Sequence, residues 1–211
     1  MPHASIILRE HNLIIASHQF WVLNINGQPV SELNGMATDS ATRQPKPVGS
    51  PNDLLKVWEY ILDGGESNLE LYSISGPGLY QPDQSACSML EGDFETVVKV
   101  KWEKALLAAN TINQQDIKYN MFASNNNNAF LHAFSSFISG NAVAINDQDV
   151  SVGNSNSVAR TLGDIMGFAP VNLSGRLVTG QEKNLLPRDV YPDLYEDAIL
   201  QRPCRPRLLL R

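Results

Sequence analysis

The sequence contains little cysteine and no long hydrophobic run, and both absences exclude classes of protein. Cys87 and Cys204 are its only cysteines, and neither lies in a Cys-x-x-Cys pair or in a Cys/His cluster of the zinc-binding kind. We therefore expect a reduced protein without a metal or cofactor, in which Cys87 is a buried or incidental thiol rather than a nucleophile. No apolar stretch is long enough to cross a bilayer, so we also expect no membrane span.

The sequence also lacks a secretory leader and a basic surface pattern. Residues 1–10 hold no charged region followed by a long apolar run and a cleavage site, so we expect no secretory signal. The chain has 22 acidic and 16 basic residues and a net charge of −6, whereas nucleic-acid binding needs a basic face. We expect no nucleic-acid partner, and a nucleic-acid-cutting toxin is the least favoured class. The Arg-rich residues 200–211 resemble a solvated or docking tail.

The length of 211 residues fits one domain over residues 1–211. Residues 120–150 are a candidate insertion, because they contain a run of four asparagines at 125–128. A helix is expected to follow this run, with His132 on its exposed side. Asn146–Asp149 resembles part of a calcium loop but lacks the glycine spacing and the bidentate glutamate, so we predict no calcium site.

The first third of the chain has the pattern of strands. Ile6–Arg9 and His18–Ile25 are rich in β-branched and aromatic residues, which favours strands. Asn26-Gly27 favours a type I′ turn, so residues 28–34 should return antiparallel, with His18 opposite residue 35. A further strand is predicted at Asn68–Ser75.

Three segments are predicted to be helices. Leu54–Leu62 predicts a short helix, and Phe94–Ala109 predicts an amphipathic helix that Asp93 caps. The third helix contains Val158, Leu162, Ile165 and Met166 at helical spacing. Together with the strands, these segments predict an α+β fold in which a small antiparallel sheet packs against helices.

The start of the third helix carries the sequence Asn154-Ser155-Asn156-Ser157. Unpaired N–H groups and the positive end of the helix dipole converge there, so an attacking oxygen and an oxyanion would both be stabilised. Ser155, and after it Ser157, are therefore candidate nucleophiles, with Asn154 and Asn156 beside the oxyanion position. The alternative is that these residues only cap the helix.

A serine nucleophile needs a base, and His18 is the candidate among the four histidines. It begins a predicted strand, and the hairpin brings Glu32 and Asn34 back beside it. Either residue could hold the imidazole and select its tautomer.

These two patches, residues 18–39 and 152–168, resemble the circularly permuted papain-like hydrolases, a group that includes permuted NlpC-type peptidases and lecithin-retinol acyltransferase-like proteins. The resemblance implies His18 as base, Asn34 or Glu32 as orienting residue, and Ser155 at the position where the group has cysteine. A serine needs the base to remove its proton during attack. A natural serine variant, a cysteine enzyme inactivated by substitution and a degenerate binding domain are all consistent with this difference.

Residues 32–39 and 154–157 are also similar to domains of bacterial toxins and secreted effectors. This resemblance implies hydrolysis of an amide bond in a peptidoglycan peptide or a protein. A phospholipase or acyltransferase acting on an ester is less favoured, because the net charge of −6 opposes binding to anionic membranes. The same fold could also be an inactive binding module. The resemblance further implies an antibacterial protein exported without a signal peptide by a specialised secretion system, or otherwise cytoplasmic, with an immunity protein or secretion component as partner.

Overall fold

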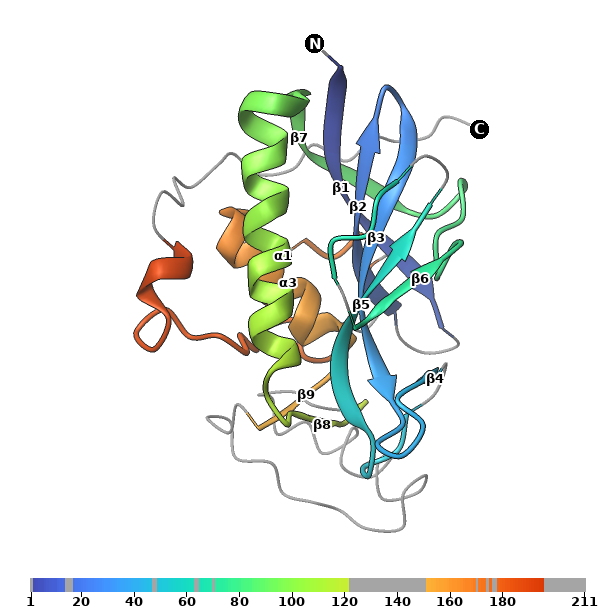
Figure 1. Ribbon diagram of the computed structural model, residues 1–211, viewed down its shortest axis with the longest axis vertical. Helices are drawn as coiled ribbons and strands as arrows, with labels where there is room; N and C mark the ends of the chain where they lie inside the picture. Colours follow the sequence, from blue (N-terminus) through green and yellow to red (C-terminus); the bar gives the residue numbers. More distant parts are fainter. Residues whose placement is uncertain are drawn as a thin grey trace.

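The structure is a computed structural model that describes residues 2–13, 17–46, 49–62, 65–69, 71–121, 151–169, 171–173, 175 and 178–195. The expectations for residues 122–150, including His132 and the asparagine run, and for the tail at 200–211 lie outside the described residues. In the described part, a curled sheet is covered on one face by helices α1 and α3 (Figure 1). The fold is therefore broadly α+β.

Within the described residues, nine strands form one mainly antiparallel sheet in the order β7-β1-β2-β3-β5-β8-β9, with β4 beside β3 and β6 beside β5. The strands are β1 His3–Asn12, β2 Ser17–Ile25, β3 Gln28–Thr38, β4 Pro45–Lys46, β5 Leu54–Ile61, β6 Ser73–Ser75, β7 Ala86–Asp93, β8 Lys118–Tyr119 and β9 Val152–Gly153. The helical elements are the π-turn η1 Phe94–Val98, α1 Lys99–Asn113, α3 Ser155–Met166 and the 3-10 turn η2 Pro192–Tyr195.

The β2–β3 hairpin confirms the predicted turn, because Asn26 and Gly27 both have positive φ, at 51° and 81°. A bulge after Leu23 shifts the register, so that Trp21 lies opposite Leu33 rather than opposite residue 32. Because neighbouring residues of a strand alternate between faces, this shift decides which side chains of β3 share a face with those of β2.

The predicted helix at Leu54–Leu62 is wrong, because this segment is the inner strand β5 between β3 and β8. Leu55 and Val57 belong to the core under the helices, while Trp58 and Tyr60 pack with Met36 on the opposite face. A strand buried on both faces has no polar alternation, and a short apolar run of this kind cannot be distinguished from a buried helix by periodicity.

Two other boundaries differ from the prediction. The strand expected at Asn68–Ser75 is confined to β6, which pairs parallel to β5. The amphipathic helix is confirmed as η1 and α1. Asp93 ends β7 opposite His3, directly before η1, and the N-cap position of α1 itself is Val98. Strand β7 was not expected, and its pairing with β1 extends the sheet up to the helix start.

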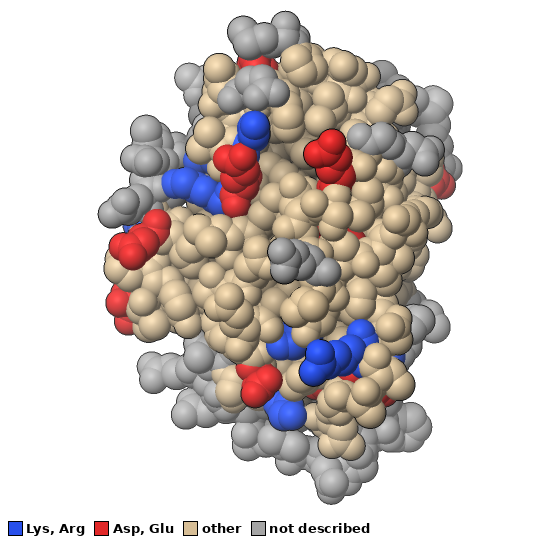
Figure 2. All heavy atoms as spheres, viewed as in Figure 1, with Lys and Arg blue, Asp and Glu red and all other residues tan. Residues whose placement is uncertain are grey.

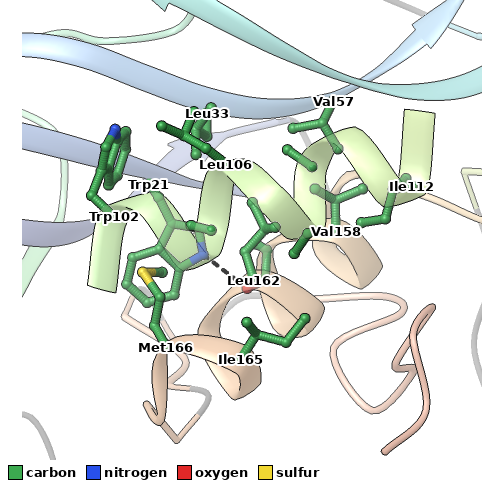
Figure 3. Close-up of a cluster of buried hydrophobic side chains, with 14 of the residues drawn as sticks. Trp21, Leu33, Val57, Trp102, Leu106, Ile112, Val158, Leu162, Ile165 and Met166 are labelled. Carbon is green, nitrogen blue, oxygen red and sulfur yellow. Dashed lines mark hydrogen bonds between the residues drawn. The ribbon is translucent and has the colours of Figure 1, made fainter. Parts of the chain in front are cut away.

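Helices α1 and α3 pack against the same face of the sheet, as Figure 3 shows. Trp21 packs against α3, and its Nε1 donates a hydrogen bond to the Ala159 carbonyl oxygen at 2.8 Å. The predicted apolar face of α3 is buried, and Gly167 ends the helix in the left-handed conformation at φ 81°. The core residues labelled in Figure 3 are Trp21, Leu33, Val57, Trp102, Leu106, Ile112, Val158, Leu162, Ile165 and Met166.

Cys87 is buried and disulfide-bonded, which corrects the expectation of a reduced thiol. The only other cysteine of the sequence, Cys204, lies outside the described residues. Wide separation along the chain says nothing about distance in space, so the sequence alone could not reveal the bond.

The surface in the view of Figure 2 is mainly uncharged, and its Lys and Arg side chains lie in separate small groups. None of the helices in the described ranges is long and apolar enough to span a membrane.

Candidate functional site

The start of α3 is held by a capping box that uses Asn154 and Ser157. The Asn154 side chain accepts a hydrogen bond from the Ser157 backbone N–H at 3.0 Å, and the Ser157 hydroxyl contacts the backbone N–H of Asn154 in return. The same hydroxyl also donates to Asn154 Oδ1 at 3.2 Å. Ser157 is fully buried, so its hydroxyl has a structural role at the helix start.

Ser155 is the first residue of α3, and its hydroxyl is not used by the cap. Among the described residues, none forms a hydrogen bond with this hydroxyl. The residue is 6 % exposed, whereas Ser157 is 0 % exposed. Of the two serines proposed from the sequence, Ser155 is therefore the one whose hydroxyl is available for chemistry.

Asn156 connects the helix start to the backbone on both sides of His18. Its Oδ1 accepts from the Gln19 backbone N–H at 2.8 Å, and its Nδ2 donates to the carbonyl oxygens of Ser17 and Thr179, each at 3.0 Å. The β2–β3 ladder ends at the Trp21 pair, so Asn156 satisfies backbone groups of β2 that no longer face a partner strand. Helix α3 thus begins where β2 and β3 separate.

Gly35 allows β3 to approach the start of α3 closely as well. A Cβ atom added to Gly35 would lie 2.9 Å from Ser155 Cα and 2.7 Å from Val158 Cβ. Gly35 follows Asn34 directly, and Asn156 follows Ser155 directly. Ser155 is therefore held between the strand that carries His18 and the strand that carries Asn34.

We expect Gly35→Ala to lower the free energy of unfolding by about 1–3 kcal/mol, because the added methyl overlaps the α3 backbone and must displace the helix start. Urea denaturation measures the loss. Gly92→Ala is the matched control, since a Cβ at Gly92 meets nothing within 4 Å. Equal stability of the two variants would contradict the close approach of β3 and α3.

The structure brings His18 and Asn34 together. The Nε2 atom of His18 lies 2.6 Å from Oδ1 of Asn34, and the ring contacts Phe20 edge-on at 6.3 Å between centroids. The amide oxygen is an acceptor, so it pairs with an imidazole that carries its proton on Nε2. Nδ1 then keeps its lone pair and is the atom that can accept a proton.

Glu32 contacts Asn34 rather than His18. Its carboxylate accepts from Asn34 Nδ2, from the Leu79 backbone N–H at 2.8 Å and from the Tyr80 backbone N–H at 3.1 Å. Burial raises the pKa of Glu32, while these donors favour its ionised form. The sequence left Asn34 and Glu32 as alternative partners of the imidazole, and the structure places them in series.

Burial lowers the pKa of His18 to about 4, although the bond to Asn34 acts in the opposite direction. His11, which lies directly opposite on β1, lowers the pKa further. The imidazole is therefore neutral at neutral pH and can act as a base.

The lowered pKa of His18 predicts a loss of stability on acidification. The unfolded chain, with an ordinary pKa of 6.5, binds the proton before the folded chain does, so stability falls as the pH drops from about 6.5 to about 4. We expect His18 to account for about 2 kcal/mol of this loss, less than the full shift implies, because the ring keeps some exposure. Urea denaturation across this pH range should show a smaller loss in His18→Gln, while His3→Gln, at an exposed position, should follow the wild type. Identical profiles for His18→Gln and the wild type would contradict the prediction.

The side chains of Asn154 and Asn156 are used by the fold rather than directed at a substrate. Asn154 Nδ2 donates to the carbonyl oxygens of Met121 at 3.1 Å and Thr179 at 3.0 Å, and Asn156 is engaged as described above. The donors left at the helix start are backbone N–H groups of the first turn of α3, which have no partners within the helix. The sequence did not indicate the bracing role of Asn156, because its contacts lie 137 and 139 residues away.

Three elements carry the candidate residues: Ser155 is on α3, His18 on β2, and Asn34 and Glu32 on β3. Hydrogen bonds join His18, Asn34 and Glu32 to one another, whereas none of them is bonded to Ser155. In the part of the chain that the structure describes, no group of three or more His, Cys, Asp or Glu residues could hold a metal ion. Comparisons with protein families, curated proteins and solved structures found no match. The chemistry of the site must therefore be argued from its geometry.

Proposed function

We propose that the protein is a hydrolase of the permuted papain-like kind that cleaves an amide bond with Ser155, His18 and Asn34. Two observations carry this proposal: the 2.6 Å contact between His18 Nε2 and Asn34 Oδ1, and a start of α3 whose Ser155 hydroxyl has no hydrogen-bond partner among the described residues. A nucleophile, a base and a residue that orients the base are the parts that covalent acyl transfer requires.

In the proposed reaction, Ser155 Oγ attacks the carbonyl carbon while His18 Nδ1 takes the hydroxyl proton. Backbone N–H groups at the start of α3 stabilise the oxyanion. The C–N bond then breaks, and His18 gives its proton to the leaving nitrogen. Water attacks the acyl ester, His18 takes a proton from that water, and collapse of the second intermediate returns the proton to Ser155 Oγ.

The neutral imidazole of His18 suits a serine nucleophile. Serine chemistry starts from a neutral imidazole, which is the form that burial imposes through a pKa of about 4. A thiolate–imidazolium pair would require His18 to keep its proton at neutral pH. A thiolate at position 155 would itself raise the pKa of His18, so the lowered pKa agrees with a natural serine variant and leaves the other two explanations open.

The resemblance to secreted effectors leads to the proposed setting. A peptide crosslink of the cell wall, or a protein, is the proposed substrate; a phospholipid ester is the alternative that the same chemistry allows. Export by a specialised secretion system and inhibition by an immunity protein belong to the same proposal. The net charge of −6 favours the amide over an anionic lipid surface.

A non-catalytic binding module is the second candidate. The capping box of Asn154 and Ser157 favours it, because the box explains much of the polar sequence at the helix start without any reaction.

Two experiments distinguish these functions. Incubation of the protein with purified peptidoglycan fragments, and separately with phospholipid vesicles, followed by mass analysis, identifies the bond that is cleaved. We expect peptide products from the wild type and none from His18→Ala. A fluorophosphonate probe should label Ser155 in the wild type only. Absence of both products and labelling would favour the binding module, and lipid products would favour the esterase.

A second pair of measurements tests the biological setting. The wild type and His18→Ala are each expressed in the cytoplasm and in the periplasm of a bacterial host. We expect a growth defect from the wild type in the compartment that holds its substrate. No defect in either compartment would contradict the toxin proposal.

A further inference from the structure

Glu32 is a buried carboxylate that the reaction proposed above does not use. It is 0 % exposed, and three N–H groups converge on it, from Asn34 Nδ2, Leu79 and Tyr80. Val22 lies opposite Glu32 in the hairpin, so the two side chains share a face of the sheet. Residues two or four apart in a strand also share a face, which places His18 of β2 and Asn34 of β3 on the same side as Glu32. Its position suggests a role in the arrangement of those two residues.

We propose that Glu32 is a positioning residue, which fixes the amide orientation of Asn34 and thereby the Nε2–H tautomer of His18. An ionised carboxylate only accepts hydrogen bonds, so Asn34 must turn its Nδ2 toward Glu32. The Oδ1 atom is then presented to His18, which must donate from Nε2. The catalytic meaning of this tautomer rests on the proposed function, whereas the tautomer itself does not.

The carboxylate is held in place from the opposite side by the segment that contains Leu79 and Tyr80. Arg9 of β1 fixes this segment: its Nη1 donates to the Gln81 carbonyl oxygen at 3.1 Å, and its guanidinium lies 4.6 Å from the centre of the Tyr80 ring. The backbone donors of the segment are therefore anchored to β1 as well as to Glu32. This two-sided support limits rotation of the carboxylate and keeps its oxygen on Asn34.

Glu32→Gln tests the proposal because it keeps the shape and removes one acceptor. A glutamine offers one oxygen and one NH₂ group to three donors, so one side of it must face a donor. When the NH₂ faces Asn34, the Asn34 amide turns over and presents its own NH₂ to His18. The imidazole then has to accept at Nε2 and carries its proton on Nδ1, where it can no longer act as base.

The experiment reads the tautomer of His18 directly from ¹⁵N NMR of the full chain, with the resonance assigned by its loss in His18→Gln. We expect the Nε2–H form in the wild type and a mixed or Nδ1–H form in Glu32→Gln, together with at least a tenfold lower kcat where activity is found. Glu59→Gln is the matched control. Glu59 is also fully buried in this sheet and accepts from the loop N–H groups of Asn68 and Leu69 at 2.7 and 2.9 Å. We expect it to lose stability without a change in the tautomer.

A wild-type His18 that carries its proton on Nδ1 would overturn the proposal, and so would an unchanged tautomer in Glu32→Gln. If Glu32→Gln does not fold, Glu32→Asp takes its place: it keeps the charge but withdraws the carboxylate from Asn34, and an unchanged tautomer there has the same consequence. Because the measurement needs no substrate, it can succeed in a protein that hydrolyses nothing. The two proposals therefore fail separately.

Discussion

Ser155→Ala should abolish turnover and leave the fold unchanged. The hydroxyl has no hydrogen-bond partner among the described residues, so its loss removes the nucleophile without removing a structural contact. We expect kcat/KM on the peptide substrate to fall by at least about 10³-fold. The free energy of unfolding, measured by thermal denaturation, should stay within about 0.5 kcal/mol of the wild-type value, as for other substitutions that break no contact.

Ser157→Ala is the matched control for this prediction. It removes the hydroxyl of the residue two positions after Ser155, which belongs to the capping box, so it should lower the free energy of unfolding by about 1 kcal/mol. We expect it to retain more activity than Ser155→Ala. The reverse order of the two activities would assign the nucleophile to Ser157, and full activity in both variants would exclude a serine mechanism at this helix.

Asn156→Ala should cause the largest loss of stability of the substitutions proposed. It leaves the buried Gln19 N–H and the Ser17 carbonyl oxygen without their partner, while the Thr179 carbonyl oxygen keeps its bond from Asn154 Nδ2. At about 1–3 kcal/mol for each of these two groups, we expect a total loss of about 2–5 kcal/mol after relaxation. Because Ser17 and Gln19 flank His18, the variant should also disturb the His18–Asn34 contact, which the ¹⁵N spectrum of His18 reports.

Asn184→Ala is the control that distinguishes a general loss of stability from a disturbance of the His18–Asn34 contact. Asn184 also forms three side-chain hydrogen bonds, to Asp164, Tyr195 and Leu186 at 3.0, 2.7 and 2.9 Å, but it contacts neither β2 nor β3 through them. We expect it to lower stability while the His18 spectrum and the activity of the folded fraction are retained. If Asn156→Ala behaves in the same way, the connection between α3 and β2 does not organise the site.

The predictions from sequence succeeded where the physical cause is local. The Asn26-Gly27 turn and the Asn154 cap depend on the conformations that a few neighbouring residues allow, and both are found in the structure. The apolar face of α3 follows from a period of 3.6 residues.

The predictions failed where neighbouring elements override local preference. Strand β5 was assigned as a helix because burial on both faces removes the alternation that identifies a strand. The hairpin bulge also moved the pairing of β2 and β3 by one residue relative to the count from the turn.

His18, Asn34, Glu32 and Ser155 could all be named from short patterns, since each belongs to a hairpin or a helix start that its own neighbours specify. The bonds that join His18, Asn34 and Glu32, and the approach of β2 and β3 to the start of α3, are properties of the folded chain. They depend on a side chain of α3 that bonds β2 across 137 residues, on a glycine that lets β3 approach the helix, and on a carboxylate that reaches the imidazole through an amide. Local patterns contain no information on such pairings, because the contacting groups meet only after the sheet has separated at β2 and β3 and the helix has filled the opening.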